Sequence, residues 1–298
     1  MPLGSCKLCG QERELQLSHI LPAFVFRWLR SSSGNGHIRL GMEPNKRVQD
    51  GLKKHWLCVE CEGRLNKSET AFANAMFHPY TSNAATRIPY GHWLIEFAVS
   101  LSWRVLRFYR DEDGLEDWAP EALARLDAAE LVWRELLMGQ RPHPGAYEQH
   151  VLPLDQIESA SGELAPNLNR YVMRAVDMDL VRGGSCVYTY AKLGRFIFLG
   201  FIHEPNPRHW RGTKIAANEG VIGPRDYVLP RPFGEYLNGQ ARRMAKLLAS
   251  VSPAQKTKIN EAFRQNVDRY MASDAYRAML ADFSMFGDDA FSKPDPAA

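Results

Sequence analysis

The chain has 298 residues, 45 % of them hydrophobic and 24 % charged, which predicts one large or two ordinary globular domains with a packed core. It has no N-terminal apolar stretch of signal-peptide length, and its most apolar run, residues 93–108, contains charges and is too short to span a membrane. A cytoplasmic protein is therefore expected. The net charge of +3 is uneven, because residues 1–90 hold 12 Lys and Arg against 7 Asp and Glu, which favours a polyanionic partner.

Four of the five cysteines form two C-x-x-C pairs, Cys6 with Cys9 and Cys58 with Cys61. Disulfides are disfavoured in a reducing compartment, so paired C-x-x-C motifs point to a metal. A two-residue spacer lets each pair place two thiolates about 2.3 Å from one ion, and two pairs complete a tetrahedron. A redox dithiol would instead sit within a βαβ pattern, which surrounds neither pair. The sequence predicts one structural zinc ion held by all four cysteines.

The segment between the two cysteine pairs predicts a strand that presents a histidine. Leu15 and Leu17 alternate with polar residues, and Pro22 ends regular pairing just beyond His19. Residues 23–30 follow as a short amphipathic helix, and residues 55–57 lead as a strand into the second pair. The backbone fixed by zinc is therefore expected to direct His19.

A helix is predicted to leave the second cysteine pair. Its apolar face contains Leu65 and Phe72, while Glu62, Asn66 and Glu69 follow one another at helical spacing on another face. This stripe of oxygen donors is either a solvated face or a set of ligands for a cation. Because the stripe starts at the second cysteine pair, ligands for a cation are favoured.

Together these motifs resemble the zinc-binding branch of the HNH endonuclease family, a ββα-metal or treble-clef fold. The resemblance covers about residues 5–77 and rests on two C-x-x-C pairs, a strand that ends in S-H-I-L-P, and a helix that follows the second pair. It implies that His19 is the general base that activates water for attack on a phosphodiester. It also implies a second, catalytic divalent ion such as Mg²⁺ or Mn²⁺, for which Glu62 and Asn66 are the expected site residues.

The sequence departs from the family pattern at three places. Ser18 precedes the histidine where an Asp that binds the ion is common, and Glu62 follows the second knuckle where His or Asn is common. The middle Asn has no clear counterpart, since Lys53 lies about there and Asn45 and Asp50 lie further upstream. These departures leave the ligand set of the ion open. They also leave open that the module is a catalytically inactive relative of the family.

The remaining two-thirds of the chain predict a second unit. Residues 78–91 have the composition of a linker, which places the domains at 1–90 and 91–298, and residues 141–154 contain three prolines and are expected to be irregular. A β-hairpin is expected near residues 186–202, with a Lys-Leu-Gly turn. The predicted helices cover residues 93–109, 120–137, 233–250, 253–273 and 274–283.

The predicted protein is thus α+β, with a zinc-stapled ββα module followed by a mostly helical domain that contains a β-hairpin. The predicted function is metal-dependent hydrolysis of nucleic acid, with DNA favoured over RNA. A non-catalytic zinc module that binds nucleic acid or protein is the alternative. A homo-oligomer, or a protein partner bound through the helical domain, stays open. Five basic residues of that domain suit either a phosphate backbone or a solvated helix face: Arg242, Arg243, Lys246, Lys256 and Lys258.

Overall fold

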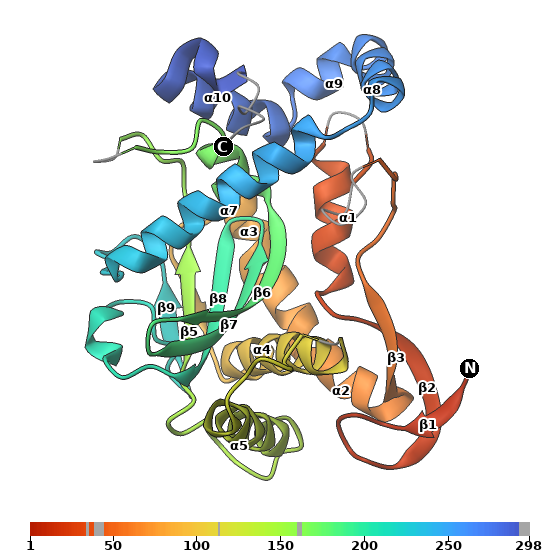
Figure 1. Cartoon of the computed structure of the whole chain (residues 1–298), viewed down its shortest axis with the longest axis vertical. Coiled ribbons are helices and arrows are strands. Elements are labelled where there is room, and N and C mark those ends of the chain that lie inside the picture. The colour runs from red at the N-terminus through yellow and green to blue at the C-terminus, as the bar shows by residue number, and fades with distance from the viewer. Residues whose placement is uncertain (34–35, 39–44, 113, 160–162, 292–298) are drawn as a thin grey trace.

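A computed structural model describes residues 1–33, 36–38, 45–112, 114–159 and 163–291 of the chain (Figure 1). The fold is mixed α and β and begins with a three-stranded antiparallel sheet in the order β1–β2–β3. The predicted strand ends at His19, which lies opposite Lys53, and the predicted helix begins after Pro22. The bounds are β1 Leu3–Ser5, β2 Glu12–His19, α1 Ala23–Ser31 and β3 Lys53–Cys58.

Helix α2 (Val59–Phe72) starts directly at the end of β3, as the second cysteine pair predicts. Glu60 and Glu62 lie in its first turn, where negative charge interacts favourably with the helix dipole. A π-helical turn (Ala73–Phe77) then continues α2 into the short helix α3 (His78–Thr81). The strands and α2 therefore follow one another in ββα order, with α1 inserted between β2 and β3.

Residues 78–91, predicted as a linker, belong instead to the packed structure. Pro79 lies in α3, within the continuous helical run that extends from α2 through the π-helical turn. Strand β4 (Ile88–Tyr90) pairs with β9 (Gly220–Ile222), which no local pattern could reveal because the two are far apart in the chain. One hydrophobic core contains buried side chains from both sides of residue 90.

The predicted hairpin is confirmed as β7 (Cys186–Leu193) and β8 (Phe196–His203), with Gly194 in the turn at φ +57°. It forms the centre of a four-stranded antiparallel sheet in the order β5–β8–β7–β6. Strand β5 (Gln149–Pro153) lies in a segment predicted to be irregular, and β6 (Val176–Gly183) was not predicted. The second half of the chain is thus a helix-covered sheet rather than a helical domain with a lone hairpin.

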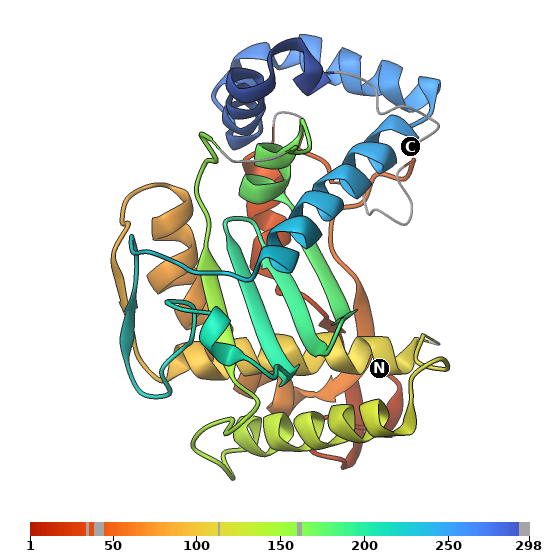
Figure 2. The same ribbon diagram turned by 60° about the vertical axis from the view of Figure 1, so that its left-hand side comes forward.

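Helices cover both faces of this sheet, since α7 (Arg231–Ala249) crosses one face and α4 (Trp93–Asp111) crosses the other (Figure 2). Alternate residues of β8 therefore enter two different cores: Phe196 and Phe198 face α4, while Ile197 and Leu199 face the side of α7. Helix α4 approaches closely at Gly200, where an added Cβ would lie 2.2 Å from Oγ of Ser102.

The predicted helices of the second half lie close to their expected positions, and α6 (Leu168–Arg174) was not predicted. Pro253 opens α8, and the Oγ of Ser252 accepts a hydrogen bond from the amide of Gln255, as expected of an N-cap. The predicted helix over 253–273 is interrupted at Asn266. No helix among the described residues is both long and apolar enough to cross a membrane. The bounds are α4 Trp93–Asp111, α5 Pro120–Leu137, α6 Leu168–Arg174, α7 Arg231–Ala249, α8 Pro253–Gln265, α9 Val267–Met271 and α10 Asp274–Phe286.

Candidate functional site

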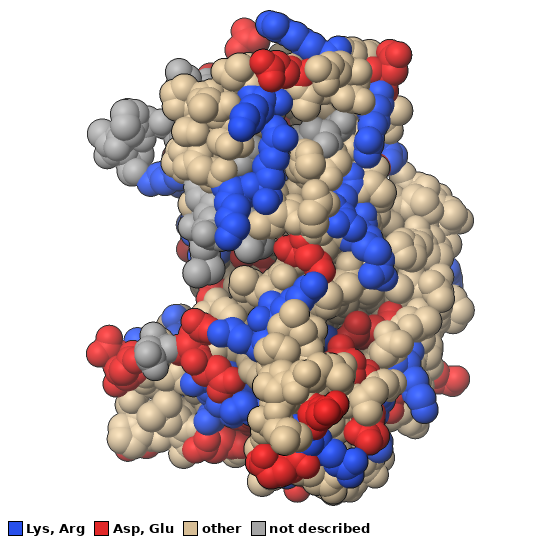
Figure 3. Space-filling model, turned by 90° about the vertical axis from the view of Figure 1, so that its right-hand side faces the viewer, with Lys and Arg blue, Asp and Glu red and all other residues tan. Residues whose placement is uncertain are grey.

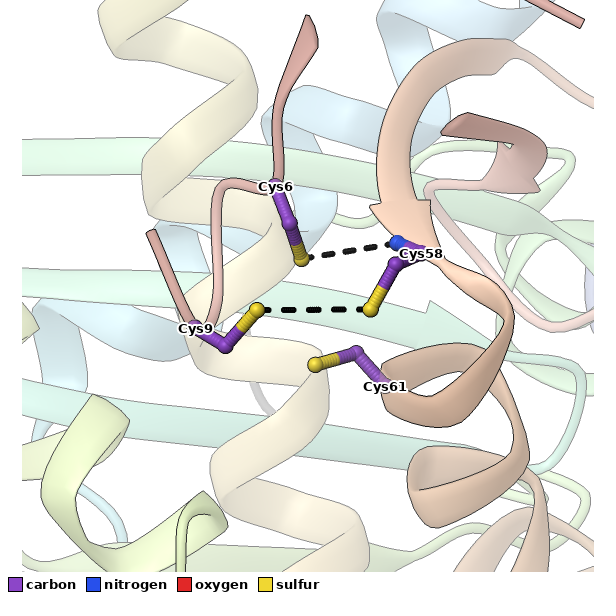
Figure 4. A group of neighbouring side chains, drawn as sticks. All are labelled: Cys6, Cys9, Cys58 and Cys61. Carbon is purple, nitrogen blue, oxygen red and sulfur yellow. Dashed lines mark hydrogen bonds between the residues drawn. The ribbon is translucent and has the colours of Figure 1, made fainter. Parts of the chain in front are cut away.

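The four predicted zinc ligands converge at one point (Figure 4). Cys6 and Cys9 come from the turn between β1 and β2, Cys58 ends β3, and Cys61 lies in the first turn of α2. All four sulfur atoms lie within 4.8 Å of one another. Sulfurs bound about 2.3 Å from a tetrahedral ion would be about 3.8 Å apart. The measured distance of 4.0 Å between Sγ of Cys9 and Sγ of Cys58 fits that geometry.

The electrostatics of this cluster also favour a cation. Burial by itself raises the pKa of the Cys6 thiol, but hydrogen bonds from backbone amides, including those of Cys9 and Cys58, bring it down to about 7. Burial and the neighbouring sulfurs raise the pKa of Cys61 well above its usual range. Four thiolates cannot share this space without a positive ion between them. The residues therefore fit a structural zinc ion, as predicted from the sequence.

His19 lies at the end of β2 and points toward the chain that precedes β3. Its Nε2 is 2.8 Å from Oδ1 of Asp50, and the side chain is 20 % exposed. This separation is an ion-pair distance, but Nε2 has no well-aligned hydrogen bond among the described residues. The backbone of His19 is fixed separately, because its carbonyl oxygen accepts a hydrogen bond of 3.2 Å from Nη1 of the buried Arg104.

Asp50 joins His19 to a cation. Its Oδ2 lies 2.7 Å from Nζ of Lys53, and its Oδ1 accepts a hydrogen bond of 2.9 Å from the amide of Gly51. Burial would raise the pKa of the carboxyl group, but the contacts with Lys53 and His19 outweigh it and lower the pKa to about 2. Asp50 is therefore a carboxylate at neutral pH, and its Oδ1 faces Nε2 of His19 at 2.8 Å.

The predicted stripe on α2 is partly engaged in other contacts. Glu62 accepts a hydrogen bond of 2.6 Å from Oγ of the buried Ser18, and Glu69 forms an ion pair of 2.6 Å with Arg104. Asn66 lies between them and is exposed. Within the described part of the chain, no hydrogen bond or ion pair joins His19 to Glu62 or Asn66. Ser18 and His19 are adjacent in a strand, where successive side chains point to opposite faces.

Asp50 is the residue that sequence reasoning underrated. Its Gln49-Asp50-Gly51 context predicts only a turn. In the family pattern, Asp50 lies upstream of the position expected for the middle Asn. No local signal placed Asp50 beside His19, because the register that pairs Lys53 with His19 is set by the sheet. The four cysteines are the only group of three or more Cys, His, Asp or Glu side chains in the described ranges that lie close enough to hold one ion.

Comparison with known proteins gives no family for this chain: no family model, curated protein or solved structure matches it.

Proposed function

We propose that the chain is a zinc-stapled endonuclease of the HNH type that hydrolyses phosphodiester bonds of nucleic acid, with DNA favoured over RNA. The observation that carries the proposal is the pairing of His19 with Asp50 at the end of β2. Two further features support it: the order β2, β3, α2, which suits a ββα module, and the four cysteines that anchor the start of both β2 and α2.

In this mechanism His19 is the general base and Asp50 is its positioning residue. Asp50 keeps the proton on Nε2, so Nδ1 holds the free electron pair that accepts a proton from the attacking water. The water oxygen then forms a bond to phosphorus while the bond from phosphorus to the leaving oxygen breaks. The leaving oxygen takes a proton from solvent. Lys53 is the cation that the described residues place beside the pair, and it suits a negatively charged phosphate.

The second ion implied by the family resemblance has less support. Both oxygens of Asp50 already contact groups that carry protons, and Glu62 is bound to Ser18, so the described side chains assemble no three-donor site beside His19. We propose a second ion such as Mg²⁺ or Mn²⁺, near Glu62 and Asn66, as a supplement to the mechanism and not as one of its steps. Cleavage measured over a titration of each metal, in protein that retains its zinc, tests whether this ion is needed.

The surface charge supports a nucleic acid partner. On the face shown in Figure 3, Lys and Arg gather over the upper half with few acidic neighbours, whereas both signs mix in the lower half. The second half of the chain contributes exposed basic residues on α7 and α8 to the molecule's surface: Arg242, Arg243, Lys246, Lys256 and Lys258. Cations of this kind bind phosphates without regard to sequence. A reducing cytoplasm, which we also propose, suits four zinc-bound thiolates.

The test separates catalysis from folding. His19→Ala should lower the cleavage rate by roughly 10²–10⁴-fold, because that is what general-base catalysis contributes. Asp50→Asn should lower it at least tenfold, because an amide no longer fixes the charge and tautomer of His19. His55→Ala is the matched control, since His55 is an exposed histidine of the same sheet. All three variants should keep the wild-type zinc content and affinity for nucleic acid.

Two results would count against the proposal. If His19→Ala lowers stability and leaves the specific activity of the folded fraction unchanged, His19 is a structural residue. If wild-type protein binds DNA or RNA but cleaves neither with Mg²⁺, Mn²⁺ or no added metal, the non-catalytic zinc module replaces the nuclease.

A further inference from the structure

A cavity of about 820 Å³ lies between the N-terminal zinc module and the helices of the second half. In Figure 1, α1 stands on one side of this region and α7 on the other, with β6 between them. The volume lies within the range of small-ligand and nucleotide sites. Most of the wall is apolar, with side chains from both halves of the chain: Ile20, Leu21, Phe26, Leu29, Leu52, Val176, Met178, Met244 and Leu247.

The cavity begins next to the proposed catalytic pair. Ile20 and Leu21 directly follow His19, and Leu52 directly precedes Lys53. The amide of Ile20 donates a hydrogen bond of 3.1 Å to the carbonyl of Leu52, which joins these two edges of the wall. The chain segments that present His19 and Lys53 therefore continue directly into this edge of the cavity wall.

The wall offers aromatic rings. Phe108 and Tyr109, from the end of α4, line it together with Met244 of α7. Flat aromatic side chains are the surfaces on which proteins stack unpaired bases, with little regard to base identity. Gln240 adds a polar group to the same wall: it is 7 % exposed, and its Oε1 has no hydrogen-bond partner among the described residues.

Arginines add positive charge to this wall. Arg170, Arg174 and Arg243 line the cavity; Arg170 pairs with Asp282 at 2.7 Å, and Arg243 pairs with Asp177 at 3.2 Å. Arg174 is 9 % exposed, and its ion pair with Asp274 is long, at 3.9 Å. Burial lowers its pKa to about 10, so the guanidinium remains charged at neutral pH, and it donates hydrogen bonds to the hydroxyl of Ser32 and the carbonyl of Leu29. The cavity therefore suits a ligand that combines apolar, stackable groups with negative charge.

We propose that this cavity receives unpaired nucleosides of a single strand, DNA or RNA, whose phosphate lies at His19, so that the enzyme's substrates are single-stranded regions. The inference rests on the proposed nuclease function and names its substrate class. A duplex keeps its bases stacked and paired inside, so it offers phosphates to the arginines but nothing to the apolar wall. Only a strand with free bases can use both parts of the site.

The experiment measures binding by the full-length His19→Ala variant, which does not consume the substrate. Fluorescence anisotropy at about 100 mM salt compares a labelled single strand of about 12 nucleotides, as DNA and as RNA, with the corresponding DNA duplex. At least tenfold tighter binding of the single strands is expected. The DNA and RNA arms show which backbone the site accepts.

A cavity-filling variant then locates the site. Met244→Trp, added to His19→Ala, should weaken single-strand binding at least tenfold and change duplex binding less than twofold. Leu131→Trp is the matched control, because Leu131 is 54 % exposed on α5 and lies outside the cavity. A thermal melt of each variant checks that it folds.

Photocrosslinking keeps the test decisive if Met244→Trp does not fold. A single strand with 5-bromouracil should crosslink to peptides that contain Phe108 or Tyr109. Equal affinity for single strands and duplex, no effect of a folded Met244→Trp variant, or crosslinks confined to other peptides would overturn the single-strand site and leave the nuclease proposal standing. No binding to any nucleic acid would instead count against the proposed function itself.

Discussion

Phe72, at the end of α2, packs against aromatic rings from the second half of the chain. It is fully buried, and its ring stacks on that of Phe97 with the centroids 4.2 Å apart. Two rings from β8 meet it edge-on, Phe196 at 5.4 Å and Phe198 at 5.3 Å, and Phe24 and Phe77 lie at 6.0 and 6.1 Å. Phe72 therefore joins the zinc module to both α4 and the four-stranded sheet.

Phe72→Ala should destabilise the whole chain rather than the zinc module alone. Removal of a buried phenyl ring costs about 3–5 kcal/mol, and about 4–5 kcal/mol is expected because several neighbouring rings lose a partner and rigid elements cannot collapse into the cavity. For a protein of this size, each kcal/mol lowers the melting temperature by about 2–4 °C, so a fall of roughly 8–20 °C is expected. Phe263→Ala, a change at a ring that is 42 % exposed, is the control and should cost less than about 0.5 kcal/mol.

The assay follows urea unfolding with two probes in the same samples: zinc release to a chromogenic chelator, and far-ultraviolet circular dichroism, which is dominated by the helices of the second half. In the wild type and in Phe72→Ala, the two transitions should coincide and shift together. Zinc release at lower urea with an unchanged dichroism transition would refute this reasoning. It would show that residues 1–90 unfold as the separate domain that the sequence predicts.

Two further predictions concern the four-cysteine cluster and the buried Lys192. Elemental analysis should find about one zinc ion per chain, and Cys58→Ser should lose it; because the core is shared, this loss should lower the melting temperature of the whole protein. Zinc retained in that variant would contradict the four-cysteine site. Lys192 is fully buried on β7, and burial lowers its pKa to about 7. Between that value and the ordinary lysine pKa, the unfolded chain binds one more proton than the folded chain, so this residue makes stability rise with pH above 7. The free energy of unfolding, measured from pH 7 to 8.5, should rise more steeply in the wild type than in Lys192→Met, by about 1 kcal/mol per pH unit. Equal slopes would mean that Lys192 stays charged in the folded protein.

The sequence by itself determined the features that depend on neighbours in the chain. The spacing within each C-x-x-C pair identified the four cysteines that converge where a metal ion could be held, and the alternation of Leu15 and Leu17 before Pro22 identified the strand that presents His19. The helices over 93–109 and 120–137 and the turn at Gly194 were likewise found from local periodicity and turn chemistry. Each of these signals lies within a few residues of the structure that it predicts.

Tertiary structure alone decided which distant residues meet. It placed Asp50 beside His19 and Glu62 where it accepts a hydrogen bond from Ser18. It also paired β4 with β9 and added β5 and β6 to the predicted hairpin. The composition of residues 78–91 is typical of a linker and could not show that β4 pairs with β9. The partner of such a short strand depends on how distant segments of the chain pack. The physical reason is the same in each case. Closing a long loop costs entropy that is offset only by burial in the assembled core, and no local pattern records which segments share that core.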